Sequence, residues 1–167
     1  MPVSRWSVLL SCVSLCACTA KPNPPVDVGA IERTIHQLTD SLVAAEVRRD
    51  IETVLNAYAP DAILHVPGMP ALVGREAMRP VVKEFLALPF TDEVMKGRAV
   101  IVAASGDLAY DIGADNLVTK TAAGQTEEAG KSIIIYRKID GQWKVTANSY
   151  STDAGPATAL APAATPK

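Results

Sequence analysis

The sequence is poor in the residues that most often bind metals or act as nucleophiles. Its only cysteines are Cys12, Cys16 and Cys18, so residues beyond position 18 have no thiol for a disulfide, a metal site or nucleophilic chemistry. The only histidines, His36 and His65, do not have metal-ligand spacing. The sequence therefore predicts no metal site and no cofactor.

The chain also lacks a marked excess of charge and the common catalytic or phosphate-binding motifs. Its 16 basic and 18 acidic residues are interspersed and leave a formal net charge of -2, which argues against a nucleic-acid partner. It contains neither a glycine-rich phosphate loop nor a Gly-x-Ser-x-Gly nucleophile elbow. Beyond the first 20 residues, no apolar run is long enough to span a bilayer.

The N-terminal segment has the features of an export signal. Arg5 precedes an apolar run from Val8 to Ala17, which predicts a signal peptide over residues 1–17. The segment Leu15 to Cys18 resembles a bacterial lipobox. That resemblance implies acylation of Cys18, a Pro-rich tether over residues 18–27, and an outer-membrane lipoprotein of the cell envelope that faces the periplasm. Ordinary cleavage after Ala20 is the alternative.

The remaining chain divides into one domain and a tail. Residues 28–153 are long enough for a single domain with a substantial core. Residues 154–167 contain mainly Ala, Pro and Thr without periodicity, and we expect a disordered tail there.

Within the domain, the pattern predicts helices followed by long strands, which is an α+β fold. The clearest local signal is Asp140-Gly141 between two β-rich runs, which predicts a tight hairpin. Asp27 is a plausible helix N-cap. We expect helices over 27–45, 50–57 and 75–88, and strands over 61–66, 71–73, 94–104, 108–119, 125–139 and 142–152.

Four motifs in this order resemble the NTF2-like superfamily, and most closely its DUF4440 and SnoaL-like members. They are Tyr58–Leu64, Val73–Met78, Asp107–Tyr110 and Tyr136–Val145. The resemblance implies a cone in which a curved antiparallel sheet wraps around three N-terminal helices. It also implies a homodimer formed through the outer face of the sheet.

The best-known chemistry of this superfamily is ketosteroid isomerisation by an aspartate base, with a tyrosine and a protonated aspartic acid holding the oxyanion. When the family's catalytic positions are aligned to this sequence from its motifs, the base position corresponds to Val66, the tyrosine position to Leu42 and the buried acid position to Ile133. Aliphatic side chains neither abstract a proton nor donate a hydrogen bond, so the resemblance argues against isomerase activity.

Strand alternation predicts which polar residues face the cavity. On 108–118 the even-numbered residues are more apolar, so we expect Tyr110 and Asn116 to face inward and Asp111 and Asp115 to point to solvent. On the last strand, Thr146, Asn148 and Tyr150 share one face, and the resemblance implies that this face is turned toward the cavity. On the first strand, His65 is expected opposite Val66. The candidate ligand-binding residues are Tyr110, Asn116, Thr146, Asn148, Tyr150 and Val66.

Three functions compete. The leading one is a lipid-anchored, non-catalytic domain that binds a small, largely apolar ligand. The second is an enzyme of SnoaL-like isomerase or hydratase type. The third is a protein-interaction dimer with a self-filled core, in which Ile134 and Tyr136 form the contact. A cavity of roughly 300 Å³ or more favours the first two.

Overall fold

The computed structural model describes residues 25–121 and 124–153. Cys18, the predicted signal peptide, most of the tether and the predicted tail lie outside these residues. The described part of the chain forms helices and strands in the order α1 (Val28–Val47), α2 (Ile51–Ala57), β1 (Tyr58–His65), β2 (Leu72–Val73), α3 (Arg75–Leu86), β3 (Phe90–Val102), β4 (Leu108–Thr121), β5 (Gly124–Ile139) and β6 (Gln142–Thr152). None of the helices in this part is long and apolar enough to cross a membrane.

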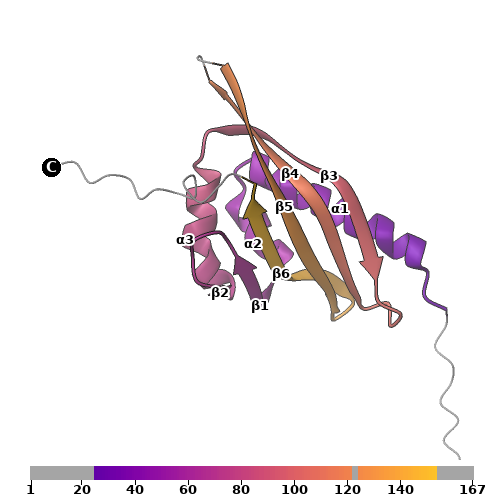
Figure 1. Ribbon diagram of the computed structural model, residues 1–167. Coiled ribbons are helices and arrows are strands. Elements are labelled where there is room, and N and C mark those ends of the chain that lie inside the picture. The colour runs from indigo at the N-terminus through magenta and orange to yellow at the C-terminus, as the bar shows by residue number, and fades with distance from the viewer. Residues whose placement is uncertain (1–24, 122–123, 154–167) are drawn as a thin grey trace, which may run out of the picture.

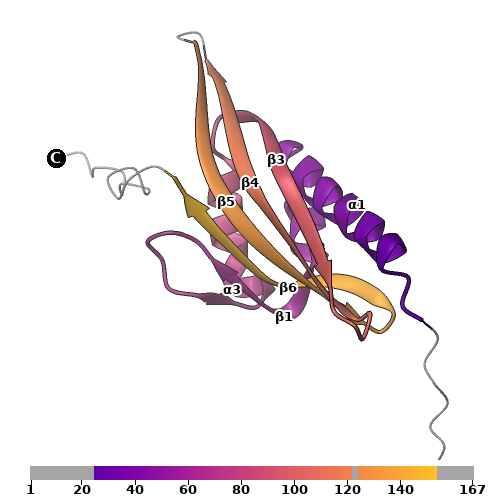
Figure 2. The ribbon, with the colours of Figure 1, turned by 45° about the vertical axis from the view of Figure 1, so that its right-hand side comes forward.

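The strands form one curved sheet in the order β2-β1-β6-β5-β4-β3. The helices lie against one face of this sheet, and the long β4–β5 hairpin extends past them (Figures 1 and 2). This arrangement confirms the predicted α+β class and the curved sheet. One detail differs, because β1 pairs with β6 in parallel while the other pairs are antiparallel.

Local sequence signals set the bounds of the helices. The Asp27 side chain accepts a hydrogen bond from the backbone N–H of Ala30 and caps α1, and Asp50 caps α2 through Thr53. The apolar stripe of α1 supplies buried residues including Ile35 and Leu42. At the β5–β6 turn, Asp140 and Gly141 have φ angles of 48° and 80°, in agreement with the predicted hairpin.

The predicted orientation of β4 is wrong. Asp111 is fully buried and Asp115 is half-buried, whereas Ile112 on the opposite face is exposed. The prediction assumed that no cation lies near enough to compensate a buried carboxylate. That assumption fails because Arg98 of β3 pairs with Asp111 through two donors, with its Nε 3.0 Å from Asp111 Oδ2.

A β-bulge brings Arg98 to the inner face. The register of β3 against β4 shifts between Lys96 and Ala99, and Gly97 has a φ of 60°. Without the bulge, alternation from Glu93 and Met95 would place position 97 on the inner face and position 98 outside. The extra residue reverses this order and turns the Arg98 side chain inward.

The buried Asp111 also anchors α1. The Thr39 hydroxyl on α1 donates to Asp111 Oδ2 at 2.8 Å and lies 2.8 Å from the Tyr136 hydroxyl of β5. Arg98 additionally donates to the His36 carbonyl oxygen and to the Asp40 carboxylate, both on α1. One network of hydrogen bonds therefore joins α1 to β3, β4 and β5.

The orientation expected for β5 is likewise reversed. Ile134 and Tyr136 are 5% and 2% exposed and belong to the core, whereas Ile133 is 43% exposed. The sequence offers isoleucines on both faces of this strand, so alternation alone does not decide which face is inner. The pairing of Tyr136 with Thr39 decides it.

We predict that Arg98→Met lowers the free energy of unfolding by about 3–5 kcal/mol, because it leaves the Asp111 carboxylate buried without its cation. Urea denaturation monitored by circular dichroism measures this loss. The double variant Arg98→Met/Asp111→Leu is the matched control, and it should be more stable than the single variant because no buried charge remains. A single variant within about 1 kcal/mol of the wild type would contradict the assigned role of Arg98.

Candidate functional site

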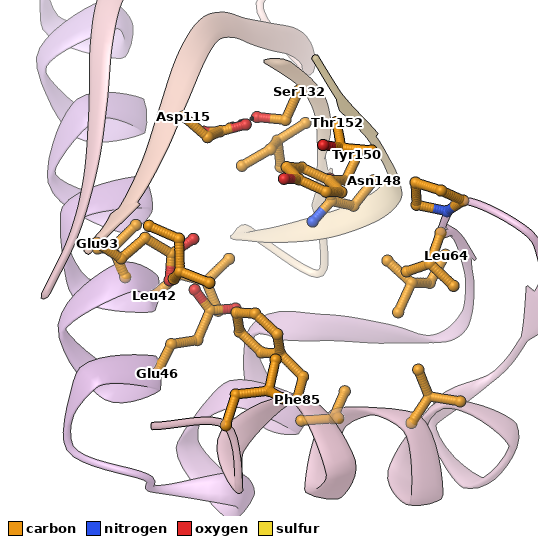
Figure 3. Close-up of a pocket in the computed structure, with 18 of the residues that line it drawn as sticks. Leu42, Glu46, Leu64, Phe85, Glu93, Asp115, Ser132, Asn148, Tyr150 and Thr152 are labelled. Carbon is orange, nitrogen blue, oxygen red and sulfur yellow. Dashed lines mark hydrogen bonds between the residues drawn. The ribbon is translucent and has the colours of Figure 1, made fainter. Parts of the chain in front are cut away.

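A cavity of about 310 Å³ lies between the helices and the concave face of the sheet. Most of its wall is aliphatic or aromatic, with side chains from α1, α3 and several strands (Figure 3). Its apolar lining includes Leu42, Val43, Leu64, Val66, Pro67, Met69, Val81, Val82, Phe85, Leu88, Met95, Leu117 and Ile134. A volume of this size accommodates a small organic molecule.

Carboxyl groups form one side of the cavity. Glu46 extends from α1 and Glu93 from β3, and the two lie next to one another in Figure 3 near Leu42. Asp115 of β4 lines the same cavity, with its Oδ1 3.3 Å from the Ser132 hydroxyl of β5. Glu84 and Glu128 are exposed and lie at its rim.

The acidic groups inside the cavity hold their protons more tightly than usual. Burial, and then the neighbouring Glu93 charge, raise the pKa of Glu46 well above its ordinary value. Burial raises the pKa of Glu93 to about 7, although a hydrogen bond with Glu46 and the Arg49 charge oppose the shift. Burial also raises the pKa of Asp115. Near neutral pH, Glu46 and Glu93 therefore share a proton.

The cavity also has neutral polar groups. Asn148 of β6 donates from Nδ2 to the buried Tyr58 hydroxyl at 2.9 Å, which leaves its Oδ1 without a partner among the described residues. Burial raises the pKa of Tyr150 to about 12, so this phenol is neutral at physiological pH. The Tyr150 ring passes so close to Gly130 of β5 that a Cβ there would lie 2.6 Å from the ring. Gly130 therefore makes room for Tyr150 at the cavity.

The structure brings together only some of the residues expected from the sequence. Val66, Asn148 and Tyr150 line the cavity. Tyr110 and Asn116 lie on the outer face, opposite Asp111 and Asp115, so their expected inward orientation is wrong. Thr146 is not among the lining residues.

A second bulge explains the position of Thr146. Val145 pairs with Tyr136 and Ala147 with Ile135, so β6 has one extra residue at this point. The bulge lets Val145 and Asn148 face the same side and excludes Thr146, whose hydroxyl lies 3.4 Å from the Ile135 carbonyl oxygen. His65 is exposed, as expected.

Of the three positions aligned with isomerase catalytic groups, two line the cavity and one does not. Leu42 and Val66 line the cavity, so aliphatic groups do stand in the cavity at these two positions. Ile133 points outward, and its neighbours Ser132 and Ile134 face the cavity instead. The acid position placed on Ile133 from the Gly141 turn therefore does not face the cavity, and neither neighbour is a carboxylic acid.

Sequence reasoning missed the acidic wall. Glu46 lies four residues after Leu42 on the same helix, a spacing that could have placed it at the cavity. Glu93 was missed because the strand was expected to begin at residue 94, whereas β3 begins at Phe90. No cluster of potential metal ligands is found in the part of the chain that the structure describes.

Comparisons with known proteins agree with this architecture. The family model of the SnoaL-like domain matches residues 39–146, more than half of the chain. A search of curated proteins finds no match.

Several solved structures share the fold at low sequence identity. An NTF2-like protein with a cystatin-like fold from Novosphingobium aromaticivorans is 15% identical, with a TM-score of 0.67 over 79% of this chain and 88% of that one. A ketosteroid isomerase-like protein from Erwinia carotovora atroseptica is 24% identical, with a TM-score of 0.60 over 73% and 95%. An NTF2-like family protein from Streptomyces avermitilis, named as a proposed dehydratase, is 16% identical, with a TM-score of 0.64 over 75% and 99%.

Proposed function

The chain belongs to the SnoaL-like domain family, with an NTF2-like fold, and we propose that it binds a small, largely apolar ligand in the cavity of its cone. The observation that supports this most directly is the cavity itself, which is open, mostly apolar and about 310 Å³ in volume. Such a volume argues against a self-filled core. The motifs at Tyr58–Leu64 and Tyr136–Val145 further suggest a DUF4440-like member of this group.

The polar atoms of the cavity support binding rather than a purely structural role. Asn148 Oδ1 and one carboxylate oxygen each of Glu93 and Asp115 are shielded from solvent and have no partner among the described residues. A buried acceptor without a hydrogen bond is costly, so such atoms are usually satisfied by a ligand or by water. A ligand that donates hydrogen bonds to them would recover this cost.

We predict that Asn148→Ala weakens the binding of apolar compounds found in a thermal-shift screen by about tenfold, because it removes one cavity hydrogen bond. Titration calorimetry of wild type and variant measures the change. The matched control is Thr146→Ala on the same strand, which should bind within about twofold of the wild type because Thr146 lies outside the cavity.

Stability must be measured alongside binding, because Asn148→Ala also deprives the Tyr58 hydroxyl of its donor. The variant Asn148→Ala/Tyr58→Phe removes that unpaired group and should restore part of the lost stability without restoring affinity. Unchanged affinity in both variants would argue against a ligand-facing Asn148.

An enzyme of isomerase or hydratase type is the second candidate. It is favoured by Glu93, whose pKa of about 7 suits a general acid or base at neutral pH. Leu42 and Val66 count against the usual ketosteroid isomerase chemistry. Deuterium exchange at the α-carbon of a cyclic ketone, present with wild type and absent with Glu93→Gln, would favour this second function.

We also propose that the protein is exported and anchored to the outer membrane through acylated Cys18. The proposal rests on the lipobox-like segment and the Pro-rich tether, both of which lie mostly outside the described residues. We predict that Cys18→Ser moves the protein from the membrane fraction to the soluble fraction, because each buried acyl CH₂ contributes about 0.8 kcal/mol to attachment. Cell fractionation with a salt wash measures this, and a variant that still sediments with membranes would exclude lipid anchoring.

A homodimer through the outer face of the sheet is proposed from the apolar residues exposed there. Ile112 pairs directly with Ile133, and Ile101 pairs with Tyr110 beside them. Ile101, Ile112 and Ile133 are 37–43% exposed, which favours a covered surface. Sedimentation at micromolar concentration should show a dimer that Ile133→Asp dissociates. Val73→Asp, at an exposed position of β2, is the control and should remain dimeric.

A further inference from the structure

We infer that the cavity prefers ligands that carry a protonated amine on their apolar body, with the ammonium group held between Glu93, Asp115 and Asn148. This inference rests on the proposed function and names the class of ligand. It begins from the kinds of polar atom that the cavity offers. Glu93 Oε2, Asp115 Oδ2 and Asn148 Oδ1 are unpartnered within the described residues, and all three are acceptors.

The hydroxyls of Ser132 and Tyr150, which lie near these acceptors, already have acceptors of their own. Ser132 Oγ donates to Asp115 Oδ1 at 3.3 Å, and the Tyr150 hydroxyl is 3.5 Å from Glu128 Oε1. The Asn148 amide N–H is directed to Tyr58. A ligand with several donors therefore matches the open positions, and an alkylammonium has three donors and no acceptor.

The charge of the cavity lining also favours a cationic ligand. No lysine or arginine is among its lining residues in the described chain, whereas Glu46, Glu93 and Asp115 all are. The nearest cation, Arg49, stacks on the Phe90 ring at 3.6 Å and donates to the carbonyl oxygens of Leu88 and Phe90. Arg49 is therefore occupied by other partners and is not a lining residue, although its charge acts on Glu93. An anionic ligand would add to the negative charge of the acidic wall, and an ammonium group would offset it.

The preference should depend on pH in a defined direction. Glu93 faces Glu46 of α1, Asp115 of β4, Arg49 and its own neighbour Asp92, and its pKa is about 7. An ammonium group binds the carboxylate form, so binding an amine displaces the proton from Glu93. Affinity for the amine should therefore rise as pH increases from about 6 to about 8, and affinity for a neutral ligand should not.

The test uses three compounds with one naphthalene body and different head groups, namely 2-naphthylmethylamine, 2-naphthalenemethanol and 2-naphthoate. Titration calorimetry on the wild-type protein at about pH 8 should give an affinity for the amine about tenfold above that for the alcohol, with the carboxylate weakest. The advantage of the amine should shrink several-fold at about pH 6.

Glu93→Gln should reduce the affinity for the amine to about that for the alcohol, so that the ratio of the two affinities falls about tenfold. Glu84→Gln is the matched control, because it removes a carboxylate from the exposed rim and should keep the preference. An alcohol that binds wild type as tightly as the amine overturns this inference but leaves the proposed function intact. If none of the three compounds binds, both are contradicted.

Discussion

The architecture depends on the burial of one carboxylate. Asp111 lies in the middle of β4 with no exposed surface, and a charge in that position requires a cation and further donors. Arg98 and Thr39 supply them from β3 and α1. Because these partners come from different elements, satisfying one buried charge fixes how the helix is placed on the sheet.

The cavity is a consequence of that placement. Thr39 and Glu46 are seven residues apart on α1, close to two helical turns, so the helix that is held at Thr39 presents Glu46 to β3 further along. There it meets Glu93, and the two carboxyls share a proton because burial disfavours two charges side by side. The buried pair at Asp111 thus orients the acidic wall without being part of it.

Much of the fold followed from local signals in the sequence. The errors came from deciding which face of a strand points inward. The caps at Asp27 and Asp50 and the Asp140-Gly141 turn needed only short-range patterns. The inward positions of Val66, Asn148 and Tyr150 followed from the family resemblance. The inner face of β4 could not be read locally, because it depends on the bulge in β3 that turns Arg98 toward Asp111, and the exclusion of Thr146 depends on a bulge in β6. Gly97 was the visible sign of the first bulge, but a glycine in a strand does not reveal which way its neighbour turns.

The chemistry of the cavity depends on which wall positions carry polar side chains and which carry aliphatic ones. The positions on which the motif resemblance places the base and the tyrosine of ketosteroid isomerases are Val66 and Leu42, and their side chains make that part of the wall apolar. The acids lie elsewhere, at Glu46, Glu93 and Asp115, and share the cavity with the Asn148 amide and the Tyr150 phenol. With one proton shared between Glu46 and Glu93, this wall keeps negative charge at neutral pH, and on the inference above it would disfavour an oxyanion.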